Sequence, residues 1–387
     1  MKLRRLIVTT AVASVAALAL TACAQSSSAS QGGAASSASA SKDLTVFLSA
    51  DTNIQGLWEK TLIPAFVKAN PGYTVKVDFD LHGLHDQQTV AKLTAATVQK
   101  KDPGYDLVDA GFVSQIAASG LLTSVNKTNL PPIADVPAAT VAAGGTGGIP
   151  YRASSVLLAY NTTTVKTPPK TLDDLLAWIK ANPGKFTYNT PDSGGSGQAF
   201  VATVLDKTVP AADRAKMTTD YVPTLESDWA TGFATLASLN PYIYQKGVYP
   251  NGNNQVLDLL ASGQISMAPV WSDQFITGQK NGQIPASIAY TQISDPSLTG
   301  GAAYLGIPSA SPRQAGALKL AAWLLSPDAQ VLIADGIAGY PVVNLDKLPS
   351  ALQKKFADAD TGHLRPPYFA SMNSDMNKQW AQKVPGK

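Results

Sequence analysis

The sequence predicts an α/β protein made of two doubly wound α/β lobes that are joined by crossing hinge strands. One observation is the alternation of short apolar runs with amphipathic runs on both sides of residue 150, which is the pattern of strands and helices in a doubly wound sheet. A second is the nearly unbroken apolar run of residues 148–161 between these halves. Such a run is typical of a strand buried on both faces. We expect it to join two lobes beside a cleft, although a core strand of one large domain would have the same pattern.

The first 22 residues predict a lipoprotein signal peptide. Lys2, Arg4 and Arg5 precede the apolar residues 6–20, and a Leu-Thr-Ala-Cys motif ends at Cys23. This order is typical of a lipobox, in which the cysteine after the cut carries the lipid. Because Cys23 is the only cysteine, we expect a lipid anchor there and no disulfides. The alternatives are an uncleaved anchor and a chance cysteine.

Composition narrows the remaining function classes. Residues 23–42 predict a flexible tether, because residues 24–41 are only Ser, Ala, Gly and Gln and cannot form a core. The sequence is 45% hydrophobic over 387 residues, which is enough for two cores. Loss of the signal peptide would remove three of the 30 basic residues and none of the 27 acidic ones, so the formal net charge becomes zero. A neutral protein argues against nucleic acid as a partner.

We expect lobe 1 to comprise residues 43–152 and 301–341, and lobe 2 residues 153–300. In lobe 1 the patterns predict strands and helices in alternation, and Gly120 ends the last helix before the hinge. Pro64 predicts a kink in the first helix. The expected strands are residues 44–48, 74–79, 105–110 and 302–307, and the expected helices are residues 54–66, 87–100, 113–119 and 313–325.

In lobe 2 the clearest start signal is a capping box, in which Thr171 and Asp174 begin a helix that runs through Ile179. Ser326 and Pro327 predict another helix start after residue 325. Residues 342–387 are expected to form a C-terminal helical segment that packs back on a lobe. The other expected elements are strands at residues 185–189 and 264–270 and helices at residues 228–239 and 255–261.

Candidate site residues follow the strands, because ligands of doubly wound sheets bind beyond the carboxyl ends of the strands. In lobe 1 the candidates lie in the loops of residues 49–53 and 111–112. At the hinge they are the tyrosine and the arginine at residues 151–152. They are Ser49, Asp51, Thr52, Asn53, Gly111, Phe112, Tyr151 and Arg152.

The second lobe contributes a glycine-rich turn before a helix. Backbone N–H groups and hydroxyls of such a turn can hold polar or anionic oxygens, although the glycines could serve only to form the turn. A nucleophile motif around Ser196 would need glycine where Gln198 stands, and no lysine follows to make a P-loop. The candidate residues are Ser193, Gly195, Ser196, Gly197 and Gln198.

Trp271 and Asp273 form the last candidate group, at the carboxyl end of the strand of residues 264–270. An indole beside a carboxylate can stack on and hydrogen-bond a solute. The alternative is that Trp271 belongs to the core and that Asp273 caps the next helix.

With these motifs in order, the chain resembles a bacterial ABC-importer extracellular solute-binding lipoprotein of the two-lobed, periplasmic-binding-protein type II-like kind. The resemblance lies in the run from Gly148 to Asn161, the Gly-Ser turn, the strand that ends at Trp271, Leu-Leu-Ser-Pro-Asp-Ala-Gln after Trp323, and Gly-Tyr-Pro-Val at residues 339–342. The segment of residues 182–188 is most similar to a branch grouped with thiamine, polyamine and iron binders.

The resemblance implies a monomeric protein on the outer face of the membrane that captures a small solute and delivers it to an ABC permease, with no enzymatic activity and no cofactor. The expected solute is a small polar organic molecule, either an amine such as a polyamine or thiamine, or a sugar. The 7% aromatic content favours the amine. The alternatives are a secreted hydrolase and a lipoprotein that binds only other proteins. His82, His85 and Asp86 could form part of a metal site, but an exposed loop explains them as well.

Overall fold

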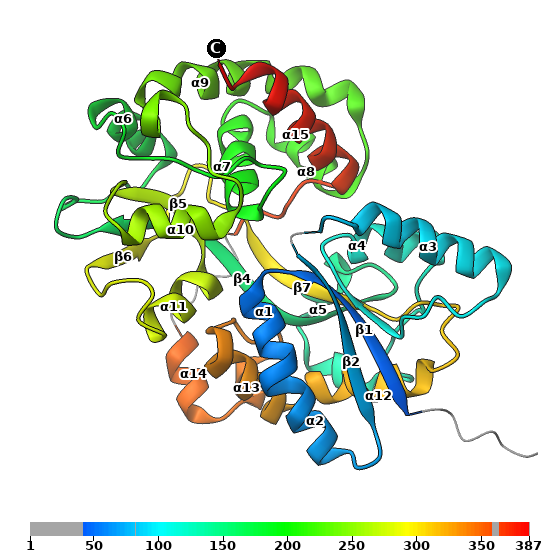
Figure 1. Ribbon diagram of the computed structural model, residues 1–387. Coiled ribbons are helices and arrows are strands. Elements are labelled where there is room, and N and C mark those ends of the chain that lie inside the picture. Colours follow the sequence, from blue (N-terminus) through cyan, green and yellow to red (C-terminus); the bar gives the residue numbers. More distant parts are fainter. Residues whose placement is uncertain (1–41, 82, 358–363, 387) are drawn as a thin grey trace, which may run out of the picture. The chain divides into compact units, whose positions relative to one another are not determined.

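The computed structural model describes residues 42–81, 83–357 and 364–386, and it has mixed α/β architecture (Figure 1). The predicted signal peptide, the lipidation site Cys23 and the tether up to residue 41 lie outside the described residues. The same is true of His82 and His363.

The strands pair in the order β2-β1-β3-β7-β4-β5, and β6 also pairs with β4. β1 is parallel to β2 and β3, whereas the pairs made by β7, β4, β5 and β6 are antiparallel. The result is the mixed sheet of an α/β protein, as expected. The strands are β1 (Asp43–Ala50), β2 (Thr74–Leu81), β3 (Leu107–Asp109), β4 (Gly148–Asn161), β5 (Met267–Trp271), β6 (Ile288–Thr291) and β7 (Gly300–Gly306).

The prediction of a strand at residues 148–161 is confirmed by β4. The first part of β4, up to Ser155, pairs with β7, and the part from Val156 onward pairs with β5 and β6. The register shifts between Pro150 and Arg152, where proline has no N–H to donate to a ladder. β4 therefore connects two separate sets of strand partners.

Helices follow most of the strands at the predicted places. The helices are α1 (Thr52–Leu57), α2 (Ile63–Ala69), α3 (Asp86–Gln99), α4 (Val113–Ile116), α5 (Ala138–Ala143), α6 (Leu172–Ala181), α7 (Gly195–Asp206), α8 (Ala211–Thr219), α9 (Ala230–Ser238), α10 (Asn253–Ala261), α11 (Ser272–Lys280), α12 (Gln314–Leu324), α13 (Pro327–Ile337), α14 (Ser350–Phe356) and α15 (Ala370–Lys383). Short 3-10 turns lie at Ala117–Ser119, Pro131–Asp135, Pro223–Trp229, Asn240–Tyr242, Tyr244–Lys246 and Leu345–Lys347.

The predicted N-cap roles of Thr171 and Ser326 are confirmed. The Thr171 hydroxyl accepts a hydrogen bond from the N–H of Asp174 (3.1 Å), and the Ser326 hydroxyl accepts one from the N–H of Ala329 (3.3 Å). Gly120 has a φ of 76° and ends the turn that follows α4. Near Pro64 the helix is interrupted by a π-helical turn, Trp58–Leu62, that separates α1 from α2.

The predicted strand at residues 185–189 is wrong. The segment makes only an isolated bridge between Phe186 and Met267. The carbonyl of Lys185 accepts from the N–H groups of Ser266 and Met267, and that of Phe186 accepts from Tyr244. Because its hydrogen bonds go to two different segments, no ladder forms, although the apolar side chains are buried as expected.

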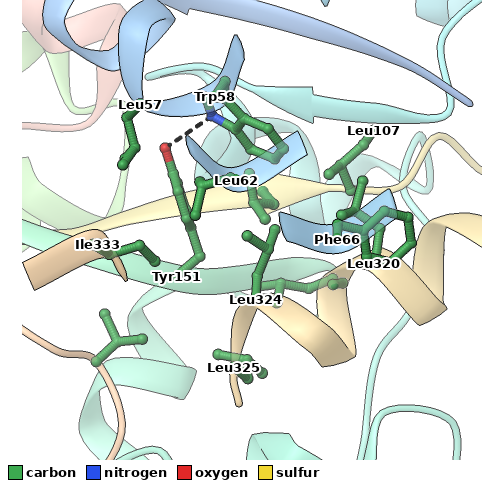
Figure 2. Packing of buried hydrophobic residues seen from close by; sticks show 14 of the residues in the cluster. Leu57, Trp58, Leu62, Phe66, Leu107, Tyr151, Leu320, Leu324, Leu325 and Ile333 are labelled. Carbon is green, nitrogen blue, oxygen red and sulfur yellow. Dashed lines mark hydrogen bonds between the residues drawn. The ribbon is translucent and has the colours of Figure 1, made fainter. Parts of the chain in front are cut away.

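Two large hydrophobic clusters fill the interior, and β4 contributes to both. Ile149 and Tyr151 belong to the first cluster, together with side chains from β1, α1, α12 and α13 (Figure 2). Val156 and Leu158 belong to the second, together with α6, α7 and α9.

The C-terminal segment divides between the two clusters. Residues 342–356 contribute apolar side chains to the first. Met372, Met376 and Trp380 of α15 are buried in the second, so their predicted core role is confirmed. Figure 1 shows α15 beside α7 and α9. The lobe boundaries stay a prediction, because all described residues cluster as one unit.

No single helix of the described residues is long and apolar enough to cross a membrane. α12 and α13 meet that criterion only as a pair, by length and composition, and they are bent by 69° at their junction.

Candidate ligand-binding site

The start of α1 is joined to two distant helix starts by hydrogen bonds. The Asn53 amide donates to Asp273 Oδ2 at 3.1 Å, at the start of α11. The Asn253 amide, at the start of α10, donates to Asp51 Oδ2 at 3.0 Å. These bonds link segments that are 220 and 202 residues apart in the sequence. The predicted residues Asp51, Asn53 and Asp273 therefore lie together, and Asn253 joins them.

Asp273 is a buried carboxylate with an unused acceptor. Its side chain is only 4% exposed, and its Oδ1 atom has no hydrogen-bond partner among the residues that the structure describes. Burial raises the pKa of Asp273, while Arg152 and the Asn53 amide oppose that rise and the charge of Asp51 adds to it. A buried carboxylate with a free oxygen can bind a donor or a cation at little further desolvation cost.

Trp271 lies at the end of β5, two residues before Asp273, and is half-buried. Its indole packs against the start of α7, because a Cβ atom on Gly195 would lie 2.8 Å from Trp271 Cζ2 and 3.0 Å from Nε1. The predicted residues Gly195 and Trp271 are thus in contact. That the two residues belong to a ligand-binding site stays a prediction.

The rest of the Gly-Ser turn does not hold solute oxygens as predicted, because its hydrogen-bond donors bind other residues of the protein. The Asn189 Oδ1 atom accepts from the Ser196 hydroxyl and from the N–H of Gly197, both at 2.8 Å. Asn253 Oδ1 accepts from the Ser196 hydroxyl at 2.8 Å and from its N–H at 3.2 Å. These donors at the start of α7 are satisfied within the protein, so the expected cradle for solute oxygens is not open at Ser196 and Gly197.

Ser193 and Gln198 are also engaged within the chain. The Ser193 hydroxyl donates to the carbonyl of Thr190 and accepts from the N–H of Gly252 at 2.8 Å. The Gln198 amide donates to Asn377 Oδ1 at 3.5 Å. The Gly-Ser turn therefore acts mainly as a support for Trp271 and Asn253.

The hinge residues form a chain of hydrogen bonds that begins in the first hydrophobic cluster. Trp58 Nε1 donates to Asp109 Oδ2 at 3.0 Å, and the Tyr151 hydroxyl donates to the same oxygen at 2.5 Å. Figure 2 shows the further contact of Trp58 Nε1 with the Tyr151 hydroxyl, at 3.4 Å. Arg152 Nε donates to the Tyr151 hydroxyl at 2.7 Å. Asp109 thus orients Tyr151, and Tyr151 holds Arg152.

The ionisable groups along this series of hydrogen bonds shift one another's pKa. Burial raises the pKa of Asp109, against the lowering effects of Arg152, Tyr151 and Trp58. Burial disfavours the Arg152 guanidinium, but Tyr151, Asp109 and Asp273 together raise its pKa. Arg152 is therefore a half-buried cation.

The loop residues of the first lobe divide into two groups. Asp51 and Asn53 reach the site, whereas Ser49 bonds to Asp86 and helps to lower the pKa of that carboxyl, which burial raises. Thr52 and Gly111 are exposed. Phe112 is only 6% exposed and packs on Phe47 with ring centroids 6.4 Å apart, so its position does not support the predicted contact with a solute.

Two surface hollows lie apart from Arg152, Trp271 and Asp273. One, of about 240 Å³, lies between α11, α13 and Lys355. The other, of about 270 Å³, is lined by β2, α3 and Tyr105. There His85 Nδ1 lies 2.7 Å from Asp80 Oδ1. Among the described residues no group of three His, Cys, Asp or Glu side chains is placed to hold a metal ion.

Sequence reasoning missed Asn189, Asn253, Trp58 and Asp109. Asp109 could have been suspected from its position at the end of β3, two residues before the candidate Gly111. The two asparagines carry no comparable signal, because asparagine is common in turns and at helix starts and its partner is set by tertiary structure.

Residues 61–359 match the model of the bacterial extracellular solute-binding protein family. The chain belongs to this family. A curated relative, Protein YnjB of Escherichia coli (strain K12), is 29% identical over 227 residues, which cover 56% of this chain. The alignment spans 57% of the length of that relative.

Solved structures confirm the fold of this solute-binding protein. Maltose-bound T. maritima MalE3 has a TM-score of 0.68 at 14% identity, with 89% of this chain and 95% of that chain covered. A GABA receptor has a TM-score of 0.65 at 20% identity, with 88% and 96% covered. The spermidine/putrescine-binding protein PotD of Streptococcus pneumoniae has a TM-score of 0.62 at 14% identity, with 88% and 99% covered. Because these proteins bind chemically different solutes, the shared fold leaves the solute open.

Proposed function

We propose that this extracellular solute-binding protein serves an ABC importer and captures a small polar organic solute beside Trp271 and Asp273 for delivery to a membrane permease. The observation that carries the proposal is the buried Asp273 carboxylate, which keeps one oxygen without a partner among the described residues and stands two residues after the half-buried Trp271. The family match supports solute binding. It does not support the alternatives of a hydrolase or a lipoprotein that binds only proteins.

A solute with a cationic amine fits this part of the site best. An ammonium group can donate to Asp273 Oδ1 and can also lie over the face of Trp271. A sugar could stack on the indole as well, and its hydroxyls could donate to the same oxygen. The amine is favoured because it compensates the charge of a buried carboxylate, which a neutral sugar does not.

Identification of the natural solute tests the proposal. Purified protein is denatured, the released small molecules are identified by mass spectrometry, and the solute is titrated calorimetrically into the wild type, Trp271→Ala and Asp273→Asn. Loss of a desolvated cation–π contact, worth about 2 kcal/mol, should weaken binding about thirtyfold in Trp271→Ala. Asp273→Asn should weaken an amine strongly and a neutral sugar much less.

Matched variants separate site effects from general damage. Trp178→Ala removes another half-buried indole, on α6, and Asp258→Asn removes an exposed carboxylate on α10. Both should retain wild-type affinity. Full affinity in Trp271→Ala and Asp273→Asn would place the solute elsewhere.

We further propose that Cys23 carries the lipid that holds the protein on the outer face of the membrane. The Leu-Thr-Ala-Cys motif and the tether that follows it support this proposal. Cys23→Ser should release soluble protein or leave the signal peptide uncut, as measured by membrane fractionation and intact-mass spectrometry. A mature Cys23→Ser protein that still sediments with membranes would contradict it.

A further inference from the structure

Arg152 has donors that the chain does not use. The one hydrogen bond that its side chain makes with the described residues is the bond from Nε to the Tyr151 hydroxyl. The terminal nitrogens Nη1 and Nη2 make no hydrogen bond or ion pair with any residue in the described ranges. A guanidinium carries five N–H donors in a fixed plane, and the two terminal nitrogens are those that bind a carboxylate bidentately.

The surroundings hold Arg152 in a defined orientation. Tyr151 is fully buried, and its hydroxyl is fixed by Asp109, which Trp58 also binds. The Asp109 Oδ2 atom that receives both bonds is therefore occupied. Asp109 orients the guanidinium through Tyr151, and the ends of the guanidinium stay available.

Asp273 supplies the opposite charge nearby. The Ser272 hydroxyl, one residue before Asp273, accepts a hydrogen bond from the N–H of Ser155 at 3.2 Å, which ties the start of α11 to β4 three residues after Arg152. The two charged groups interact electrostatically. They nevertheless make no ion pair among the described residues, and Asp273 Oδ1 has no partner there.

Two opposite charges that are near each other but unpaired fit a solute that carries both charges. We propose that the solute is a zwitterion whose anionic group binds Arg152 Nη1 and Nη2, while its ammonium group binds Asp273 Oδ1 beside Trp271. This inference rests on the proposed solute-binding function and specifies its chemical class. A diamine would place its second ammonium near the guanidinium, which like charges disfavour. A neutral sugar would bring no charge to either Arg152 or Asp273, so neither residue would gain an ion pair with the solute.

The test uses probes that differ in one charge. A series of unbranched ω-aminocarboxylates, from 3-aminopropanoate to 6-aminohexanoate, is titrated calorimetrically beside two analogues of each member. In one analogue the carboxylate is replaced by a carboxamide, and in the other the amine is acetylated. The best aminocarboxylate should bind about tenfold or more tighter than either analogue, because each analogue loses a hydrogen-bonded charge pair.

Two variants test which residue binds each end of the solute. In Arg152→Gln the preference for carboxylate over carboxamide should fall to about one, while the preference for free over acetylated amine remains. Asp273→Asn should show the reverse. Arg214→Gln, which removes a cation on α8, should keep both preferences. Because each readout is a ratio within one folded variant, partial loss of stability does not imitate the result.

The results can contradict the zwitterion without contradicting the proposed function. Equal binding of aminocarboxylates and carboxamides, or no binding by any aminocarboxylate of the series, overturns the zwitterion. If mass spectrometry then identifies a sugar or a diamine that binds at Trp271, the proposed function still stands. If no solute binds and none is released on denaturation, both fail.

Discussion

Gly195 determines where the Trp271 indole can lie. A methyl group on Gly195 would approach two atoms of that ring to 3.0 Å or less, which is closer than packed carbon atoms allow. The indole, at the end of a strand, would have to turn away. The absence of a side chain at residue 195 is thus a condition for the position of Trp271.

We predict that Gly195→Ala weakens solute binding by displacing Trp271. The loss should approach the roughly thirtyfold loss expected for Trp271→Ala, and the tryptophan fluorescence of the solute-free protein should shift. Calorimetry and fluorescence measure these two effects. Gly56→Ala is the control, because a Cβ atom on Gly56, in α1, has no neighbour within 4 Å. Unchanged affinity in Gly195→Ala would show that the indole contributes little.

The ionised Asp273 carboxylate should destabilise the solute-free protein. Burial raises the pKa of Asp273 in the folded protein above its ordinary value of 3.8, so folding disfavours its ionised form. This cost is fully present above the raised pKa and disappears below the ordinary value. Asp273→Asn keeps the shape and an acceptor for Asn53 but removes the charge.

We therefore predict that Asp273→Asn unfolds at a higher urea concentration than the wild type at pH 7, by about 1 kcal/mol in free energy. The advantage should shrink as the pH falls through the raised pKa toward 3.8. Urea titrations from pH 7 to pH 3.5 measure it. Exposed Asp258→Asn should show no such trend. A less stable Asp273→Asn protein at pH 7 would mean that Arg152 compensates the carboxylate fully.

The sequence predicted Trp271 and Asp273 because the carboxyl end of a strand is a general place for ligands. Asn253 and Asn189 could not be predicted in this way. Asn253 bonds to Asp51, which is 202 residues away, and Asn189 accepts from Ser196 across the glycine-rich turn. Neither asparagine lies in a periodic pattern. Burial of Phe112 could not be predicted either, since Phe112 lies just before α4 and its partner Phe47 lies on β1.

The start of α7 depends on side chains from outside the helix. Its N-cap residue is Gly194, which has no side chain to accept from the first turn. Asn189 and Asn253 take over that function and accept from Ser196 and Gly197. The sequence predicted the helix correctly, but it did not show that these two amides would occupy the donors of the glycine-rich turn.

We predict that Asn189→Ala destabilises the protein by about 1–3 kcal/mol, because it leaves buried donors of Ser196 and Gly197 without one of their acceptors. Asn189 is fully buried. The midpoint of urea unfolding measures this effect. Asn281→Ala, at the exposed end of α11, should change stability by less than about 0.5 kcal/mol. A loss as small in Asn189→Ala would mean that water replaces the amide.

The alternation of strands and helices was predictable because it follows from local periodicity. Residues 185–189 show the limit of that reasoning. Their apolar pattern predicts burial correctly, yet their carbonyls bond to two different segments. Whether a buried extended segment joins a sheet depends on neighbours that are distant in the sequence.

Hydrogen bonds join the start of α1 to the starts of α10 and α11, and they indicate how solute binding is coupled to opening and closing of the two predicted lobes. Each of the bonds Asn53–Asp273 and Asn253–Asp51 involves a carboxylate. A hydrogen bond to a charged group contributes about 1.5–3 kcal/mol. If the two predicted lobes rotate about β4, both bonds must break on opening, so they stabilise the closed arrangement.

We predict that Asn53→Ala shifts this equilibrium toward an open arrangement by about tenfold or more. The solute-free variant should have a larger radius of gyration in small-angle scattering than the wild type, and saturating solute should make both equally compact. Gln55→Ala is the matched control, since the Gln55 amide donates to Glu59 on the same stretch of helix. A radius of gyration that neither solute nor Asn53→Ala changes would indicate one static body. In that case the two amide–carboxylate bonds would contribute to stability alone, and solute would reach Trp271 and Asp273 without a hinge movement.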